Sequence, residues 1–228
     1  MIVTEEKPLE EIMSFLGGHK KILIAGCDGC DQPPRGLREA KSLALLIEMA
    51  SELKGEKVET TYTTVIKQCD DKIAHSTLSP LMESVDAVVS LSCGIGVQVL
   101  SDVLEDAPVF PGQNTMFMGS EEREMGTVSE RCAACGDCIL DLTAGICPIA
   151  RCSKSLLNGP CGGSQDGKCE VDKELDCAWQ LIYDRLKALG RLEQMEEIMP
   201  AKDWSTSTHG GTRRTPKEMM FMDRPRRD

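Results

Sequence analysis

The sequence has little histidine and few aromatic side chains, with three His, four Phe, two Trp and two Tyr among 228 residues. So few rings argue against the stacking platforms on which proteins hold single-stranded nucleic acid. A formal net charge of −11 argues against any partner with a phosphate backbone as well. We therefore expect no nucleic acid among the partners of this protein.

Long apolar runs and a secretory leader are also lacking. The longest apolar stretches, around residues 43–50 and 87–91, fall far short of the roughly 20 residues that span a bilayer. The first eight residues carry acidic side chains where a signal peptide has basic ones. We expect no membrane span and a cytoplasmic location. In that reducing compartment, twelve cysteines favour metal ligation over disulfides.

Nucleotide-binding and catalytic motifs are missing too. The loop from Gly26 to Asp31 lacks the G-x-G-x-x-G spacing of dinucleotide-binding proteins, and no phosphate-binding G-x-x-x-x-G-K-S/T occurs. The three histidines, His19, His75 and His209, do not combine with serine, cysteine or aspartate into a recognisable catalytic set. The sequence therefore predicts that this chain has no substrate site of its own.

The first half of the chain alternates short apolar runs with amphipathic stretches at helical spacing. The run from Lys21 to Gly26 is apolar and ends in glycine, as a buried parallel strand does. Strands are expected at 21–26, 58–66, 87–91 and 115–118, and helices at 38–53, 78–85 and 96–104. This alternation predicts the α/β class, with a small parallel sheet of Rossmann-like or flavodoxin-like form.

The composition changes after Gly119. Residues 120–129 are acidic and polar without apolar periodicity, which is typical of a linker, and residues 132–177 hold eight of the twelve cysteines. An amphipathic pattern between Leu175 and Met199 predicts a closing helix. We expect three parts: an α/β domain at 1–120, an irregular, ferredoxin-like cysteine-rich metal module at 121–200, and an extended basic tail at 201–228.

The cysteines of the second part have metal-ligand spacing. Three of them follow one another at x2 intervals and a Cys-Pro comes later, as in ferredoxin-type modules. Eight thiols make two four-cysteine sites, with two [4Fe–4S] clusters, one cluster and one zinc, or zinc alone all open. By analogy with two-cluster ferredoxins, the fourth ligand of the first three is expected not to be the next cysteine in sequence. The eight are Cys132, Cys135, Cys138, Cys147, Cys152, Cys161, Cys169 and Cys177.

The remaining cysteines each follow an expected strand. Cys27 and Cys30 come after the first strand, Cys69 after the second and Cys93 after the third. Ligands bind at the carboxyl edge of an open parallel sheet, so these four thiols predict a third metal site, most simply an iron–sulfur cluster. The alternative is four ordinary buried cysteines, since this residue type favours interiors.

Six stretches of the cysteine-rich region match a known pattern. They are the run from Cys132 to Pro148, Arg151-Cys152, residues 156–163, residues 167–171, Cys177-Ala-Trp179 and Ile182-Tyr183. Together they resemble the methylenetetrahydrofolate reductase C-terminal domain family. The N-terminal half is similar to the companion region of the small, MetV-type subunits of that family, so that the likeness covers residues of about 20 to 195.

The resemblance implies a partner and cofactors. In the family, the small subunit pairs with a MetF-type subunit, a flavin-bearing barrel that binds folate and reduces methylenetetrahydrofolate to methyltetrahydrofolate in acetogenic one-carbon metabolism, the Wood–Ljungdahl pathway. It implies that this chain takes electrons from an upstream donor protein and passes them to the FMN of that partner. The implied cofactors of the chain are two or three [4Fe–4S] clusters, with zinc as the alternative in one C-terminal site.

Two other functions stay open beside an electron-transfer subunit. One is a structural zinc module that stabilises the flavin subunit without carrying electrons, and the other is a stand-alone enzyme acting on a one-carbon substrate. The tail at 201–228 contains Trp204 and Phe221 but no apolar periodicity. It is therefore expected either to dock on the flavin subunit or to be a disordered terminus.

Overall fold

The computed structural model describes residues 1–105, 107–122, 126–207 and 211–215 of the chain. The chain divides into two compact units, Met1–Glu130 and Arg131–Asp228. The expected division at 120 and 200 stays a prediction. No helix among the described residues is long and apolar enough to cross a bilayer.

A parallel sheet forms the centre of the first unit. Its strands are β2 (Lys21–Cys27), β4 (Glu59–Val65), β5 (Ala87–Ser90) and β6 (Val109–Pro111), in the order β4-β2-β5-β6. From Ile22 to Cys27 every residue of β2 is buried, which explains why this strand is a continuous apolar run. From β2 the chain first adds β4 on one side and then crosses to add β5 and β6 on the other side. The sheet therefore has a topological switch point between β2 and β5, as flavodoxin-like folds do.

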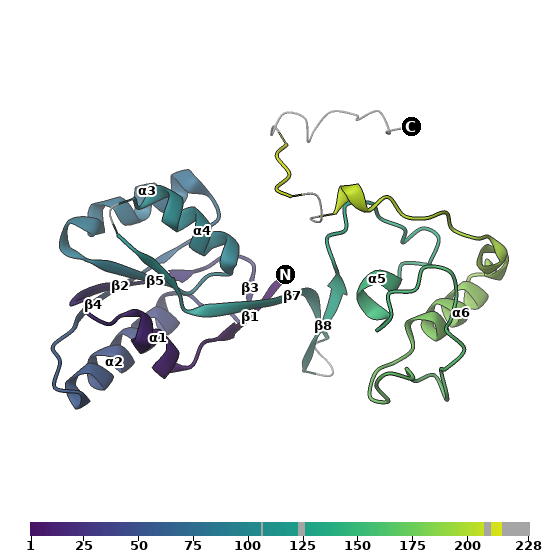
Figure 1. Cartoon of the computed structure of the whole chain (residues 1–228), viewed down its shortest axis with the longest axis horizontal. Coiled ribbons are helices and arrows are strands. Elements are labelled where there is room, and N and C mark those ends of the chain that lie inside the picture. Colours follow the sequence, from purple (N-terminus) through teal and green to yellow (C-terminus); the bar gives the residue numbers. More distant parts are fainter. Residues whose placement is uncertain (106, 123–125, 208–210, 216–228) are drawn as a thin grey trace. The chain divides into compact units, whose positions relative to one another are not determined.

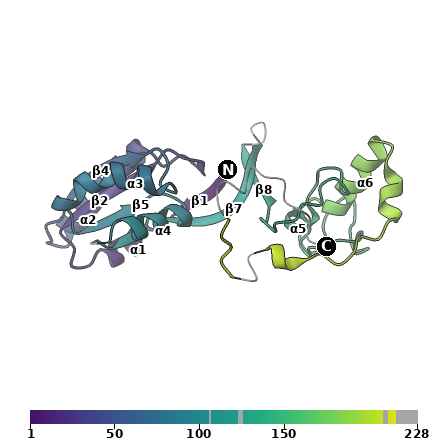
Figure 2. The ribbon, with the colours of Figure 1, turned by 90° about the horizontal axis from the view of Figure 1, so that it is seen from above.

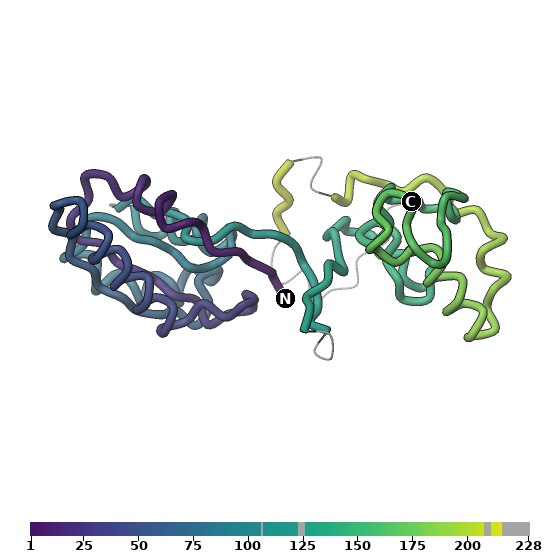
Figure 3. Tube along the Cα trace, turned by 90° about the horizontal axis from the view of Figure 1, so that it is seen from below, coloured from purple at the N-terminus to yellow at the C-terminus, as the bar shows by residue number. Residues whose placement is uncertain are grey.

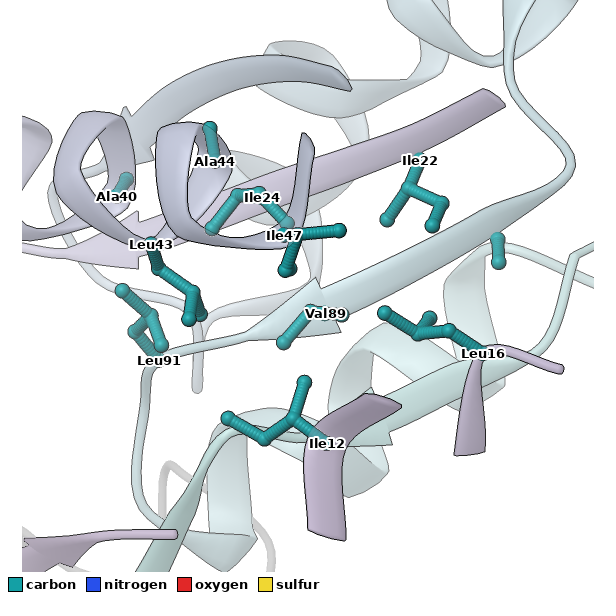
Figure 4. Close-up of a cluster of buried hydrophobic side chains, with 11 residues drawn as sticks. Ile12, Leu16, Ile22, Ile24, Ala40, Leu43, Ala44, Ile47, Val89 and Leu91 are labelled. Carbon is teal, nitrogen blue, oxygen red and sulfur yellow. The ribbon is translucent and has the colours of Figure 1, made fainter. Parts of the chain in front are cut away.

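Helices cover both faces of this sheet (Figure 1). On one face, α1 (Leu9–Phe15) and α2 (Leu37–Leu53) pack against β2 and β5, and Figure 4 shows Ile47 of α2 beside Ile24 and Val89. On the other face, α3 (Asp71–Leu78) and α4 (Gly94–Val103) enclose a second core around Leu23 and Leu100. The predicted α/β class is confirmed.

A second sheet was not expected from the sequence. It contains β1 (Ile2–Glu6), β3 (Asp31–Gln32), β7 (Gln113–Glu122) and β8 (Thr127–Cys132), in the order β3-β1-β7-β8. The prediction of a linker at 120–129 is wrong, since β7 and β8 occupy its described parts and pair with each other (Figure 2). Most residues of β7 are half-buried and most of β8 are exposed, and strands with so little buried surface need no apolar periodicity.

Two helix predictions also need correction. The helix expected at 78–85 is a 3-10 helix, Ser79–Ser84, that continues the unexpected α3, whose first turn is capped by the Asp70 carboxylate on the Ile73 N–H at 3.3 Å. The long closing helix is shorter than expected: α6 spans Ala178–Ala188, and a 3-10 helix, Leu192–Glu196, follows. Gly190, with φ of 65°, ends α6 in a conformation that favours glycine.

The second unit has little regular structure. Besides α6 it contains α5 (Pro148–Arg151) and a 3-10 helix, Trp204–Thr206. Its buried core consists of Ala144, Trp179, Ile182 and Leu186. The Trp179 indole N–H donates to the Leu156 carbonyl at 3.0 Å and ties the core to the preceding loop. So small a core leaves the irregular loops in need of another source of stability, as metal-bound modules have.

Candidate metal centres

The carboxyl edge of the parallel sheet gathers four cysteines. Cys27 ends β2, Cys69 follows β4, and Cys93 follows β5 as the N-cap of α4, while Cys30 lies between β2 and β3. Cys27 and Cys93 are buried, whereas Cys30 and Cys69 are exposed. The four thiols therefore lie at the edge where open parallel sheets bind their ligands, with two of them inside and two at the surface.

The thiols of this edge lie close enough to influence one another. Burial raises the pKa of Cys27, and the neighbouring charges of Asp31 and Cys69 raise it further. Burial likewise raises the pKa of Cys93, with Asp31 and Cys30 adding to the effect. The Asp31 carboxyl thus acts on the pKa of both buried thiols.

Backbone N–H groups partly offset the effect of burial on the two buried thiols. Those of Gln68 and Gly29 lower the pKa of Cys27, and those of Ile95 and Gly96 lower the pKa of Cys93, against the larger effect of burial. N–H donors of this kind stabilise thiolates and are among the groups by which proteins tune iron–sulfur clusters. The donor set of this edge therefore fits an anionic sulfur-ligated metal centre.

The side chain of Gln68 joins the strand ends behind the cysteines. It is fully buried, and its amide N–H₂ donates to the carbonyls of Ala25 and Gly26 at 2.9 and 2.8 Å. Its amide oxygen accepts from the Ser90 hydroxyl at 2.6 Å. One side chain therefore fixes the end of β2 relative to β5, while its own backbone precedes Cys69.

The network continues from Ser90 to the cysteine at the start of α4. The hydroxyls of Ser90 and Ser92 are hydrogen-bonded at 2.8 Å, and that of Ser92 donates to the Cys93 carbonyl at 3.1 Å. All of these side chains are buried. The loop that carries Cys93 is therefore held by the same network that holds the end of β2.

The unexpected second sheet supports the other side of this edge. The Ile2 N–H donates to the Cys30 carbonyl at 3.2 Å, and the Gly94 N–H donates to the Thr115 hydroxyl at 2.8 Å. The buried Asp31 carboxylate accepts from the Cys93 N–H at 2.9 Å, and burial raises its pKa. Sequence reasoning missed Asp31 and Gln68, whose only signal is that each adjoins a cysteine.

In the second unit, four cysteines line one cavity. Cys152, Cys161, Cys169 and Cys177 surround a space of about 20 Å³, beside Trp179. The Ser153 hydroxyl, which bonds the Cys169 sulfur at 3.4 Å, lowers the pKa of that thiol. These are the last four of the eight cysteines in the module, and the cavity groups them as one set.

The first four cysteines of the module lie on a tight loop and at a helix start. Between Cys132 and Cys138 the backbone turns through Ala134 and Gly136, with φ of 51° and 82°. The Ala134 N–H donates to the Cys132 sulfur at 3.4 Å. Cys147 is the N-cap of α5. The loop therefore already directs backbone N–H toward sulfur.

All twelve cysteines are free thiols. Among the described residues, no three Cys, His, Asp or Glu side chains stand in an arrangement that could hold a metal ion. Ligation of metal by the twelve cysteines therefore stays a prediction. The structure adds how the thiols are grouped.

The fold and the grouped thiols define an open parallel α/β domain that carries a cysteine-rich module. Residues 110–205 match the family model described as methylene-tetrahydrofolate reductase C terminal. This part of the chain is therefore similar to that family, and the resemblance found in the sequence is confirmed over those residues. No curated protein and no solved structure matches the chain.

Proposed function

We propose that this chain is the iron–sulfur electron-transfer subunit of a cytoplasmic methylenetetrahydrofolate reductase complex and passes electrons to the FMN of a MetF-type subunit. The match over residues 110–205 supports the assignment to the reductase. The observation that carries the electron-transfer role is the gathering of four thiols at the carboxyl edge of the parallel sheet, two of them buried and two exposed.

The division of this edge into buried and exposed thiols suits electron transfer. Cys27 and Cys93 would hold the inner side of a cluster, and Cys30 and Cys69 the side that reaches the surface. A [4Fe–4S] cluster supplies one-electron steps when bound. The protein then contributes the N–H donors and the low-dielectric wall that set the reduction potential, and it leaves one side open to a donor protein.

The eight thiols of the second unit form two sets in this proposal. The cavity supports a site made of Cys152, Cys161, Cys169 and Cys177. The remaining four thiols, Cys132, Cys135, Cys138 and Cys147, then make the other site. This partition differs from the ferredoxin analogy, because the fourth ligand of the three-cysteine loop becomes the next cysteine in sequence.

A structural zinc site is the second candidate for one of these sets. Cys152, Cys161, Cys169 and Cys177 line one small cavity, and no histidine or carboxylate is needed to complete a set of four ligands there. Four thiolates are a usual ligand set of structural zinc, which contributes folding energy and no redox chemistry. Zinc here would hold together a module whose apolar core is small.

Metal analysis of the anaerobically purified chain tests the proposal. We expect brown protein with equal amounts of iron and sulfide and a broad visible absorbance that bleaches on reduction. Cys27→Ser should abolish the electron paramagnetic resonance signal of one cluster and leave the metal of the second unit in place. A colourless protein that contains zinc alone would exclude the electron-transfer role and leave the structural one.

A further inference from the structure

The segment after α6 does not leave the second unit but returns along it (Figure 3). We call residues 199–207 the C-terminal strap. The Asn158 amide holds its start, donating to the Met199 carbonyl at 3.0 Å and accepting from the Met199 N–H at 2.7 Å. Near its end, the Thr206 hydroxyl donates to the Cys135 carbonyl at 2.9 Å. The strap therefore crosses the loop that carries three cysteines.

Contact between the strap and this loop is close enough to exclude a side chain. Gly136 has φ of 82°, and a Cβ at this position would collide with the Thr206 carbonyl oxygen. The Arg213 guanidinium donates to the same carbonyl. A glycine between Cys135 and Cys138 is thus what allows the strap to lie directly on the loop.

The strap carries a buried cation to the loop. The Lys202 side chain is 2% exposed, and its ammonium donates to the Asp137 carbonyl at 2.6 Å and lies 3.3 Å from the Asp137 carboxylate. The ammonium also lies 5.8 Å from the centre of the Trp204 ring. The Asp137 side chain is 58% exposed, so water weakens the charge compensation that it offers. Burying an ammonium is unfavourable unless negative charge lies nearby.

Thiolates of a metal centre on this loop would supply that charge. Asp137 lies between Cys135 and Cys138, so the ammonium is bonded to the backbone of the cysteine loop itself. A four-thiolate site is anionic whether it holds a [4Fe–4S] cluster or zinc.

We propose that the C-terminal strap is a positioning element of the metal centre on the Cys132–Cys138 loop, with Lys202 as the fixed counter-charge of its thiolates. The proposal rests on the proposed function in one respect, that these cysteines bind metal. The ammonium stabilises the anionic centre and favours its reduced, more negative state. The strap also covers the loop and slows the loss of metal.

Variants of the full chain test this role. Lys202→Met keeps the length of the side chain and removes the charge, and Lys187→Met removes an exposed lysine of α6 as the control. Thr206→Val removes the hydrogen bond to Cys135 and keeps Lys202. After addition of a chelator, alkylation of Cys132, Cys135 and Cys138, followed by peptide mass mapping, reports metal loss from this loop whichever metal it holds. Circular dichroism checks the fold of each variant.

For Lys202→Met we expect loop cysteines that become reactive roughly tenfold faster than in the unchanged protein, about the effect of one charge-assisted hydrogen bond. Where the centre is an iron–sulfur cluster, its midpoint potential should fall. Thr206→Val should speed metal loss without that fall, and Lys187→Met should change neither.

If Lys202→Met lost metal at the same rate as the unchanged protein, Lys202 would not be the counter-charge of the thiolates. If Thr206→Val lost metal at the same rate as the unchanged protein, the strap would not retain metal. If the loop cysteines of the unchanged protein were alkylated at once without chelator, the loop would bind no metal. The proposed role of the strap would then be wrong. Zinc in place of iron would contradict the proposed electron transfer at this site, while the release rates would still decide the role of Lys202.

Discussion

A single buried amide, that of Gln68, joins the three strand ends that carry Cys27, Cys69 and Cys93. Its role follows from burial, because only a fully enclosed amide must find protein partners for both its N–H₂ group and its oxygen. In the sequence it is one polar residue in a loop, between Lys67 and Cys69. Cysteine positions could be predicted because strand ends are readable from apolar runs, whereas Gln68 could not, because its partners come from β2 and β5.

Gln68→Leu should lower the free energy of unfolding by roughly 2–4 kcal/mol. The reason is that the carbonyls of Ala25 and Gly26 and the hydroxyl of Ser90 all lose a buried partner. Urea denaturation measures the loss. Gln98→Leu is the control, since its exposed amide bonds a single carbonyl, that of Gly94. Equal effects of the two substitutions would contradict the role given to the Gln68 network.

Thiol reactivity of the metal-free chain should follow the pKa directions. The Ser153 hydroxyl lowers the pKa of Cys169, whereas burial raises the pKa of Cys27 and Cys93. A lower pKa leaves more thiolate at a given pH, so alkylation of Cys169 should persist to lower pH than alkylation of Cys27 or Cys93. Pulsed labelling between about pH 6 and pH 9 with mass mapping measures this order. A Cys27 that reacts as fast as Cys169 at the acidic end would contradict it.

Strands and helices with a strong apolar pattern were predicted well, and elements without one were not. The runs that became β2 and β5 are readable because these parallel strands are buried on both faces, whereas the edge strand β4 is readable from its threonine, tyrosine and valine content. β1, β7 and β8 have mixed or exposed patterns, and their strand character comes from pairing with distant partners. The strand expected at 115–118 lies within β7, but its pairing with β1, and with it the support given to Cys30 and Cys93, could not be read from the sequence.

The grouping of cysteines around α5 and α6 predicts which substitutions act together. Cys161→Ser should remove the metal held near Cys169 and leave the loop at Cys132–Cys138 protected from alkylation, since the cavity joins Cys161 to the last set of thiols. Cys135→Ser should have the opposite effect, and both should leave the centre at the sheet edge intact. Metal counts together with alkylation maps of each variant measure this. Loss of all metal after either change would contradict two separate sites.

The complete chain offers a way to separate docking from metal retention. The predicted docking role falls on 201–228, of which 208–210 and 216–228 lie outside the described residues. Residues 201–207, which belong to the strap, contact their own module. Truncation after Thr215 keeps the strap and removes the remaining tail, including Phe221. We expect the visible spectrum of the truncated chain to be unchanged and its affinity for a MetF-type subunit to fall about tenfold or more. Unchanged binding in a titration would refute docking by that tail.

The pairing of β1 with β7 places Ile2 beside Met118, and β1 also pairs with β3, next to Cys30. β1 is thus the middle strand between a partner early in the chain and one that the ribosome makes much later. A nascent chain folds as it emerges, so the elements up to β5 can pack together before the strand that completes the Cys30 side exists. The Cys30 side of the four-thiol edge can therefore be completed only after β7 has left the ribosome.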